Sequence, residues 1–139
     1  MDKIEKNKEI ALRWLNDLWN DANYGAANEF MAANYKRHDP FNPVDSPNEY
    51  ANNIIEVYRK AFPDMKFTAE DLVAENDKVL IRWSAVATHT GPLKNLPPTG
   101  HSAKLEGMDL LRIEGDKIIE SWPGFDGLSL LKLMKIIPD

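Results

Sequence analysis

The sequence contains no cysteine among its 139 residues. Disulfides, thiolate nucleophiles and cysteine-based metal sites are therefore excluded. It also has no apolar run long enough to span a membrane, and its first residues, MDKIEKNKEI, lack the apolar stretch of a signal peptide. We therefore expect a cytoplasmic protein with no membrane partner.

Positive charge is scarce and scattered along the chain. The sequence has 17 Lys and Arg residues against 22 Asp and Glu residues, which gives a net charge of −5. Because no basic cluster is present that could follow a phosphate backbone, we expect no nucleic acid partner.

Recognisable cofactor and metal motifs are missing as well. The chain has no glycine-rich phosphate loop and no G-x-S-x-G motif for a serine nucleophile. Its three histidines, His38, His89 and His101, lie far apart and lack the short spacing typical of a zinc site. We expect neither a cofactor nor a metal.

The N-terminal half shows helical periodicity. Apolar residues recur at helical spacing over residues 3–20, and a shorter helix is expected over residues 26–33. A third helix is expected over residues 46–62, because Ser46-Pro47-Asn48-Glu49 forms a capping box with Pro at the first helical position. Residues 35–40 are expected to form a brief strand or an extended segment that leads into a loop, because Pro40 favours an extended conformation at Asp39.

The second half alternates polar and apolar residues, as β-strands do. Strands are expected over residues 67–75, 79–90, 103–114 and 117–123, and a final apolar helix over residues 128–137 should dock on the core or on a second subunit. Because Pro123 cannot donate to a sheet ladder, pairing should stop there or pass to an edge. This order predicts a single α+β domain over residues 1–139, with a curved antiparallel sheet wrapped around the N-terminal helices and a pocket between the layers.

The strand over residues 103–114 carries one residue that breaks its pattern. Its odd-numbered positions share one face, and that face is apolar except for Asp109. An ionised carboxylate on a core face costs several kcal/mol unless it is paired, hydrogen-bonded or open to a wet cavity. Asp109 is therefore a candidate catalytic acid or base. The alternative is a structural Asp bonded to backbone amides or to a nearby Arg.

Two histidines are candidates to assist Asp109. A neutral imidazole can donate to one group and accept from another, which gives His38, beside a loop, a plausible chemical role. His89 continues the apolar face of the strand over residues 79–90 and could reach the interior. We assign catalysis to Asp109, His38 and His89. Ligand binding is assigned to four aromatic residues and one serine: Trp14, Tyr58, Trp83, Ser121 and Trp122.

Several segments together resemble one known family. They are Ala61-Phe62-Pro63-Asp64, residues 79–91 ending in THTG, Leu96-Pro97-Pro98-Thr99-Gly100, and residues 109–113 followed by Gly115-Asp116-Lys117-Ile118. Their order and spacing are similar to those of the SnoaL-like polyketide cyclase family. The resemblance implies a cone of the nuclear-transport-factor-2-like type, with a deep apolar pocket and a homodimer formed through the sheet. It also implies a cofactor-independent ring closure of a small apolar molecule, in which an Asp exchanges a proton with a substrate carbon.

The sequence departs from this family at the catalytic position. The family commonly reads E-H-W-D after the D-G-K-I turn, and the final Asp is the acid/base, whereas this chain reads Glu120-Ser121-Trp122-Pro123. Proline cannot transfer a proton, so the family's mechanism does not carry over at that position. Asp109 and His38 fall at positions that the family uses for polar pocket residues. Asp126 is a further carboxylate that could turn inward.

Three functions are open at this point. The first is a cofactor-free cyclase, isomerase or hydrolase that acts on an apolar carbonyl compound, with Asp109 as general base. The second is a protein that binds a small apolar ligand without reaction, which the Pro at position 123 favours. The third is a dimerisation module, which the apolar C-terminal helix suggests and which a fully packed interior would support.

Overall fold

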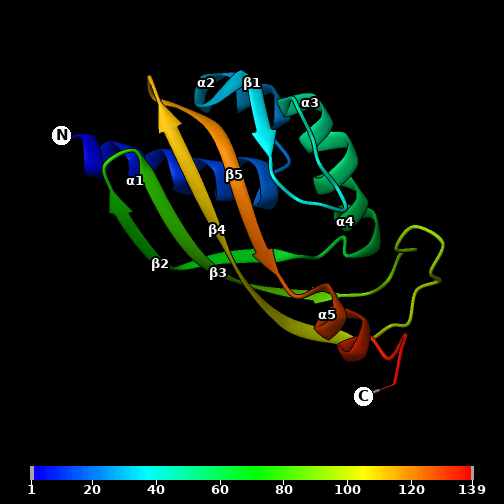
Figure 1. Ribbon diagram of the computed structural model, residues 1–139. Helices are drawn as coiled ribbons and strands as arrows, with labels where there is room; N and C mark the ends of the chain where they lie inside the picture. The colour runs from blue at the N-terminus through cyan, green and yellow to red at the C-terminus, as the bar shows by residue number, and fades with distance from the viewer. Residues whose placement is uncertain (1, 139) are drawn as a thin grey trace.

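The computed structural model describes residues 2–138 and has an α+β fold in which a curved, open sheet packs against helices (Figure 1). The helical segments are α1 (Lys3–Arg13), its π-helical continuation η1 (Trp14–Asn20), the 3-10 turn η2 (Tyr24–Ala26), α2 (Ala27–Phe30), α3 (Pro47–Tyr50), the π-helical η3 (Ala51–Ile55), α4 (Glu56–Ala61) and α5 (Gly127–Leu133). No helix among residues 2–138 combines the length and the apolar character needed to cross a membrane.

The sheet has five strands in the order β1-β5-β4-β3-β2. The strands are β1 (Met31–Arg37), β2 (Lys66–Glu75), β3 (Lys78–Thr88), β4 (Ser102–Glu114) and β5 (Lys117–Phe125). Strands β2 to β5 form the expected antiparallel meander, whereas β1 runs parallel to β5. The predicted fold class is therefore confirmed, with one parallel strand that sequence periodicity did not indicate.

Strand β1 corrects one sequence prediction. The second helix was expected to reach residue 33, but α2 ends at Phe30 and the chain becomes extended at Met31. Met31 and Tyr35 are buried, and Met31 pairs with Ile118 of β5. Alanine is the best helix former, but propensity differences among ordinary residues are below about 1 kcal/mol per residue. Burial and backbone pairing along β5 therefore outweigh the helix preference of the alanines in this segment.

The end of β1 explains how β5 accommodates a proline. Arg37 is the last residue of β1 and lies opposite Ser121, and the next backbone bond, from the His38 amide to the Ser121 carbonyl, is 2.8 Å long. Beyond Ser121, the side of β5 that faces β1 is a sheet edge. The missing N–H of Pro123 therefore removes no ladder hydrogen bond on that side. The expectation that pairing passes to an edge at Pro123 is confirmed, although β5 continues to Phe125 alongside β4.

The buried residues form two clusters. The larger one lies between the helices and the sheet and includes Trp14, Leu15 and Phe30. The smaller one lies under α5, where Leu130 and Met134 pack against Phe62 and Ala87. The predicted docking of the C-terminal helix on the core is confirmed. The helix is shorter than expected because the backbone turns to positive φ at Lys135, as helix ends commonly do.

Candidate functional site

Asp109 lies on the helix-covered face of β4, opposite Ile81 on β3 and Pro123 on β5. Its side chain is 7% exposed and lines a cavity of about 70 Å³, which we call the chamber. The chamber walls are mainly aromatic and include Trp14, Trp19, Tyr58, Phe67, Trp83 and Phe125. The interior is therefore not fully packed, which counts against a purely structural dimerisation module.

One hydrogen bond fixes the carboxyl group of Asp109. The indole Nε1 of Trp83 donates to Asp109 Oδ2 at 3.0 Å. Trp83 pairs with Gly107 across the sheet, and a Cβ atom on Gly107 would lie 2.3 Å from the Trp83 ring. Glycine at this position therefore gives the indole room to lie along β4 and reach the carboxyl group two residues further on.

The environment of Asp109 brings its pKa close to neutrality. Burial raises the pKa to about 7, and the Trp83 hydrogen bond and the Arg37 charge oppose this increase only in part. A carboxyl group with such a pKa is present in both protonation states near neutral pH, as general acid/base catalysis requires. Asp109 makes no hydrogen bond to a backbone amide or to an Arg among residues 2–138, so its structure differs from the structural Asp considered as the alternative.

Trp14 supplies a hydrogen-bond donor without a protein partner. Its ring is buried, stacks on Tyr50 with the ring centroids 6.4 Å apart, and lines the chamber. Its Nε1 atom has no hydrogen-bond partner among the described residues. Leaving a buried donor unpaired costs roughly 1–3 kcal/mol.

Arg37 lies where the chamber meets a second, more open hollow. This hollow, which we call the vestibule, has a volume of about 420 Å³ and is lined by the loop that follows β1. Arg37, Ile54, Tyr58, Pro123 and Phe125 line both compartments, so the two adjoin. A molecule larger than the chamber could therefore place one end beside Asp109 and the remainder in the vestibule.

Four residues assigned from the sequence meet at the chamber. Trp14, Tyr58, Trp83 and Asp109 all contribute to its lining, although they come from four different elements. Periodicity had placed Trp83 and Asp109 on apolar strand faces, and adjacent strands with these faces turned inward bring the two side chains together. Their roles in catalysis and ligand binding stay predictions.

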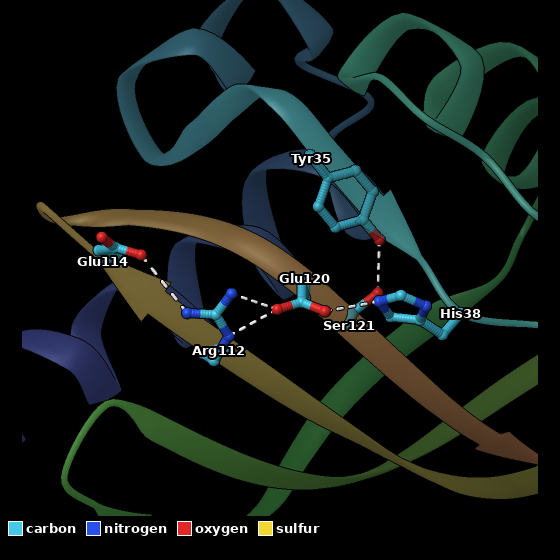
Figure 2. A network of polar contacts seen from close by, with 6 residues as sticks. All are labelled: Tyr35, His38, Arg112, Glu114, Glu120 and Ser121. Carbon is cyan, nitrogen blue, oxygen red and sulfur yellow. Dashed lines mark hydrogen bonds and ion pairs between the residues drawn. The ribbon is translucent and has the colours of Figure 1, made fainter.

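His38 and Trp122 lie apart from Asp109. The Nε2 atom of His38 lies 2.6 Å from Glu120 Oε2, and its ring stacks on Trp122 with the centroids 5.0 Å apart. Figure 2 shows a row of contacts from His38 through Glu120 and Arg112 to Glu114. Glu120 and Trp122 alternate along β5 with Ser121 and Pro123, so their side chains point to the opposite side of the sheet. His38 borders the vestibule but not the chamber.

His89 is buried in the smaller cluster under α5. Its Nδ1 accepts a hydrogen bond from the Thr99 amide at 3.3 Å, and its ring lies 5.2 Å from that of Phe62. Its Nε2 has no partner among the described residues. His89 reaches the interior as its strand face predicted, but it lines neither the chamber nor the vestibule.

Ser121 and Asp126 are both held by contacts outside the chamber. Ser121 is buried, and its Oγ lies 2.5 Å from the hydroxyl of Tyr35 (Figure 2). Asp126 is the N-cap of α5 and accepts from the Ser129 amide at 3.1 Å and the Ser129 hydroxyl at 2.6 Å. Asp126 therefore does not turn inward to replace the family's catalytic Asp.

Arg37 is the chamber residue that sequence reasoning missed. The signal was present in the alternation of Tyr35 and Arg37, which share one face once residues 31–37 form a strand. The helix expected over residues 26–33 concealed the beginning of this strand, and only its end fell within the extended segment expected from residue 35. Among residues 2–138, no group of three or more His, Asp and Glu side chains is arranged to hold a metal ion.

Solved structures share this fold over nearly the whole chain. AclR from Streptomyces galilaeus, provisionally assigned as a hydroxylase, is 25% identical with a TM-score of 0.84, and the match covers 99% of this chain and 85% of AclR. A provisional polyketide cyclase from Acidithiobacillus ferrooxidans is 26% identical with a TM-score of 0.81 over 99% of this chain and 100% of that protein. A provisional SnoaL-like polyketide cyclase from Jannaschia sp. CCS1 is 20% identical with a TM-score of 0.87 over 99% of both chains.

The sequence itself matches one family. Comparison with curated proteins gave no match. The family model described as SnoaL-like polyketide cyclase matches residues 9–133, which is most of the chain. The segments that suggested this resemblance lie within the matched range, and the fold is that of small-molecule enzymes of the cyclase and hydroxylase type. The chain therefore belongs to the SnoaL-like polyketide cyclase family.

Proposed function

We propose that this protein is a cofactor-independent enzyme that performs acid/base chemistry on a small, apolar carbonyl compound, with Asp109 as the general base. One observation carries the proposal: a single carboxyl group with a pKa of about 7 faces an aromatic chamber. A base whose pKa matches the working pH accelerates proton transfer by typically 10²–10⁴-fold, in order-of-magnitude terms.

The proposed step moves a proton from carbon to the carboxylate. One oxygen of ionised Asp109 takes a proton from the carbon next to the carbonyl, and the C–H electron pair moves onto the carbonyl oxygen as an enolate. We assign Trp14 Nε1–H as the donor to this oxygen, because Trp14 lines the chamber and this N–H has no partner among the described residues. Return of the proton from Asp109 to another carbon completes an isomerisation. In a ring closure the enolate carbon instead attacks a second carbonyl, whose electron pair moves onto its oxygen, and that oxygen takes the proton from Asp109. Preorganised donors of this kind stabilise the developing charge.

Trp83 orients the base. It donates to Oδ2 of Asp109, and no described residue donates a hydrogen bond to Oδ1. Oδ1 is therefore the oxygen that remains for the substrate. The same bond stabilises the ionised form and limits the rise in the Asp109 pKa that burial causes.

Chamber size restricts what reaches Asp109. Ligand pockets for drug-sized molecules are typically about 300–1,000 Å³, which is well above the chamber volume of about 70 Å³. Only the reacting end of a substrate fits beside the carboxyl group, and the remainder would lie in the vestibule of about 420 Å³.

Proton exchange in heavy water tests the proposal without knowledge of the natural substrate. Benzoylacetone, a neutral aromatic 1,3-diketone, would be followed by NMR for loss of its carbon-bound protons. We expect the wild-type protein to accelerate exchange and Asp109→Asn to reduce that acceleration by roughly 100-fold or more. Asp126→Asn is the matched control, since Asn also caps helices. Exchange by Asp109→Asn within about threefold of wild type would remove Asp109 as the base.

A second function has specific support. Pro123 stands where the family keeps its catalytic Asp, and the chamber is small. A non-catalytic protein that binds a small apolar ligand would use the same chamber, with Asp109 only orienting the ligand. Saturable binding of benzoylacetone without accelerated exchange would support this function over the enzyme.

We also propose a homodimer formed through the sheet, which the family resemblance implies. The face of the sheet opposite the chamber carries exposed apolar side chains on three adjacent strands: Val73, Val86 and Met108. Exposed apolar side chains on one face of a sheet favour a contact surface there, and the Arg82–Asp71 ion pair lies on the same face.

A further inference from the structure

Arg37 is a largely buried cation at the inner end of the vestibule. It ends β1, its side chain is 12% exposed, and it lines both the chamber and the vestibule. Among the residues that line the chamber it is the only Lys or Arg. A guanidinium group is rarely buried to this extent without partners for its N–H groups.

Only one guanidinium nitrogen of Arg37 is occupied by the protein. Its Nη1 donates to Asp39 Oδ2 at 3.0 Å and to the Asn42 carbonyl at 3.1 Å. Neither Nε nor Nη2 donates to a described residue. These two nitrogens form one edge of the planar guanidinium group, and that edge matches the two oxygens of a carboxylate.

The charge of Arg37 acts on the polar groups around the chamber. It lowers the pKa values of Asp109, Tyr35, Tyr50 and Tyr58 against the larger effect of burial, which raises all four. Burial keeps the tyrosines protonated at neutral pH, so Asp109 is the one group among these four that changes charge there. The chamber and the vestibule are lined by two acidic residues, Asp109 and Asp39, and Asp39 is already paired with Arg37. Asp109 is therefore the carboxyl group whose charge state would affect a carboxylate bound at the free edge of Arg37.

We propose that Arg37 binds a carboxylate on the substrate, so that the substrate class is an apolar carbonyl compound with a carboxylate close to its reacting end. The proposal rests on the proposed function, because it assigns the chamber and vestibule to one substrate. Nη1 keeps its bonds to the loop, and the bidentate pair forms on the Nε and Nη2 edge.

Benzoate and benzamide test the proposal, since they have nearly the same shape and only benzoate is charged. Binding would be followed at pH 6 through the indole N–H signals of Trp14 and Trp83 in ¹⁵N-labelled protein, assigned with single Trp→Phe variants. Asp109 is mostly protonated at this pH, so it does not repel benzoate. We expect wild-type protein to bind benzoate at least about tenfold more tightly than benzamide, as a charge-assisted bidentate pair would produce.

Substitutions identify the cation responsible. Arg37→Gln should weaken benzoate binding by roughly tenfold and leave benzamide binding within about twofold. Arg37→Lys keeps the charge but not the planar edge, and it should also weaken benzoate binding, by several-fold. If Arg37→Gln fails to fold, benzoate binding by Arg37→Lys tests whether the planar edge of Arg37 binds the carboxylate. His38→Gln removes the imidazole beside the vestibule, and Arg82→Gln removes a cation from the opposite face of the sheet. Both variants should keep the benzoate preference.

A change of pH provides a readout that a purely structural arginine would not give. At pH 8 Asp109 is ionised, so the benzoate preference should shrink in wild-type protein and should not shrink in Asp109→Asn. The proposal is overturned if wild type shows no preference, if Arg37→Gln and Arg37→Lys both keep it, or if His38→Gln loses it. In the first two cases the role of Arg37 is structural: it holds the loop that follows β1 through its hydrogen bonds to Asp39 and Asn42.

Failure of this proposal can be distinguished from failure of the proposed function. A pH titration of the Trp83 indole signal reports Asp109 ionisation with no ligand present. If that titration occurs and benzoate shows no preference, Asp109 keeps its role and the carboxylate assignment is wrong. If the titration is absent, the acid/base function fails whatever benzoate does.

Discussion

The carboxyl group of Asp109 is held in a site that favours its neutral form. Burial raises its pKa from 3.8 to about 7, and the single Trp83 bond compensates only in part. In the unfolded chain the same group ionises near pH 4. Between these two values the folded protein binds a proton that the unfolded chain has released, so folding becomes less favourable as the pH rises.

Replacement of Asp109 should therefore stabilise the protein in a pH-dependent way. Asp109→Asn keeps an oxygen that can accept from Trp83 but has no charge to bury. Its gain in free energy of unfolding over wild type should be near zero at pH 4, grow up to pH 7 and level off at about 4 kcal/mol or less. Urea unfolding at pH 5 and pH 8 measures the change, with Asp126→Asn as control. A gain that is equal at the two pH values would contradict this account of Asp109.

Asp109 could be found from the sequence because it interrupts a period of two. Its bond to Trp83 depended on which residues lie opposite in the sheet, and Gly107 gave no signal of that kind. His38 was favoured because imidazole is a common acid/base group, yet in the structure its nitrogen faces Glu120. Alternation on a regular strand placed Asp109 on the face that lines the chamber, whereas no such pattern fixed the position of His38 beside a loop. The catalytic roles of both residues stay predictions.

At the scale of elements, the pairing of β3 with β4 builds the site. Trp83 and Gly107 face each other, and the indole occupies the space that a side chain on Gly107 would need. Sequence alternation predicted both strands and their inward faces. It indicated only the end of β1, from residue 35, and not its pairing with β5, because parallel pairing joins segments that are distant in sequence and leaves no turn motif to recognise.

Gly107→Ala should disturb the site through Trp83. The added Cβ would lie 2.3 Å from the indole, so the ring must move and its bond to Asp109 should be lost or lengthened. We expect a loss of about 1–3 kcal/mol in the free energy of unfolding and a shifted Trp83 indole signal. Gly124→Ala is the matched control on β5, because its Cβ would meet only the Met108 carbonyl at 3.4 Å. Equal stability of the two variants would show that the indole position does not depend on Gly107.

At the scale of the whole molecule, the layers were predictable and the chamber was not. Periods of two and of helical spacing placed the helices against one face of a sheet. The shape of the chamber depends on how six aromatic side chains from several elements pack. The hydrophobic periodicity of a single sequence does not specify this packing. The exposed apolar side chains on the face opposite the chamber, Val73, Val86 and Met108, are likewise found together only once the strands are aligned.

The proposed dimer can be tested on that opposite face. Met108 is 46% exposed at the centre of the sheet, so Met108→Glu would place charges in the contact between two copies. Light scattering after gel filtration should give the mass of two chains for wild type and of one for the variant. Leu128→Glu, on exposed α5, is the control and should stay dimeric. A monomeric wild type would contradict the dimer directly.

The central claim is that Asp109 is a buried base poised near neutral pH, and the Trp83 indole reports on it most directly. A pH titration of the Trp83 Nε1–H signal from pH 4 to pH 9 in ¹⁵N-labelled protein should show one transition with a midpoint near pH 7. The transition should be absent in Asp109→Asn. A midpoint below about pH 5, where an ordinary carboxyl group titrates, or the same curve in Asp109→Asn, would contradict the account.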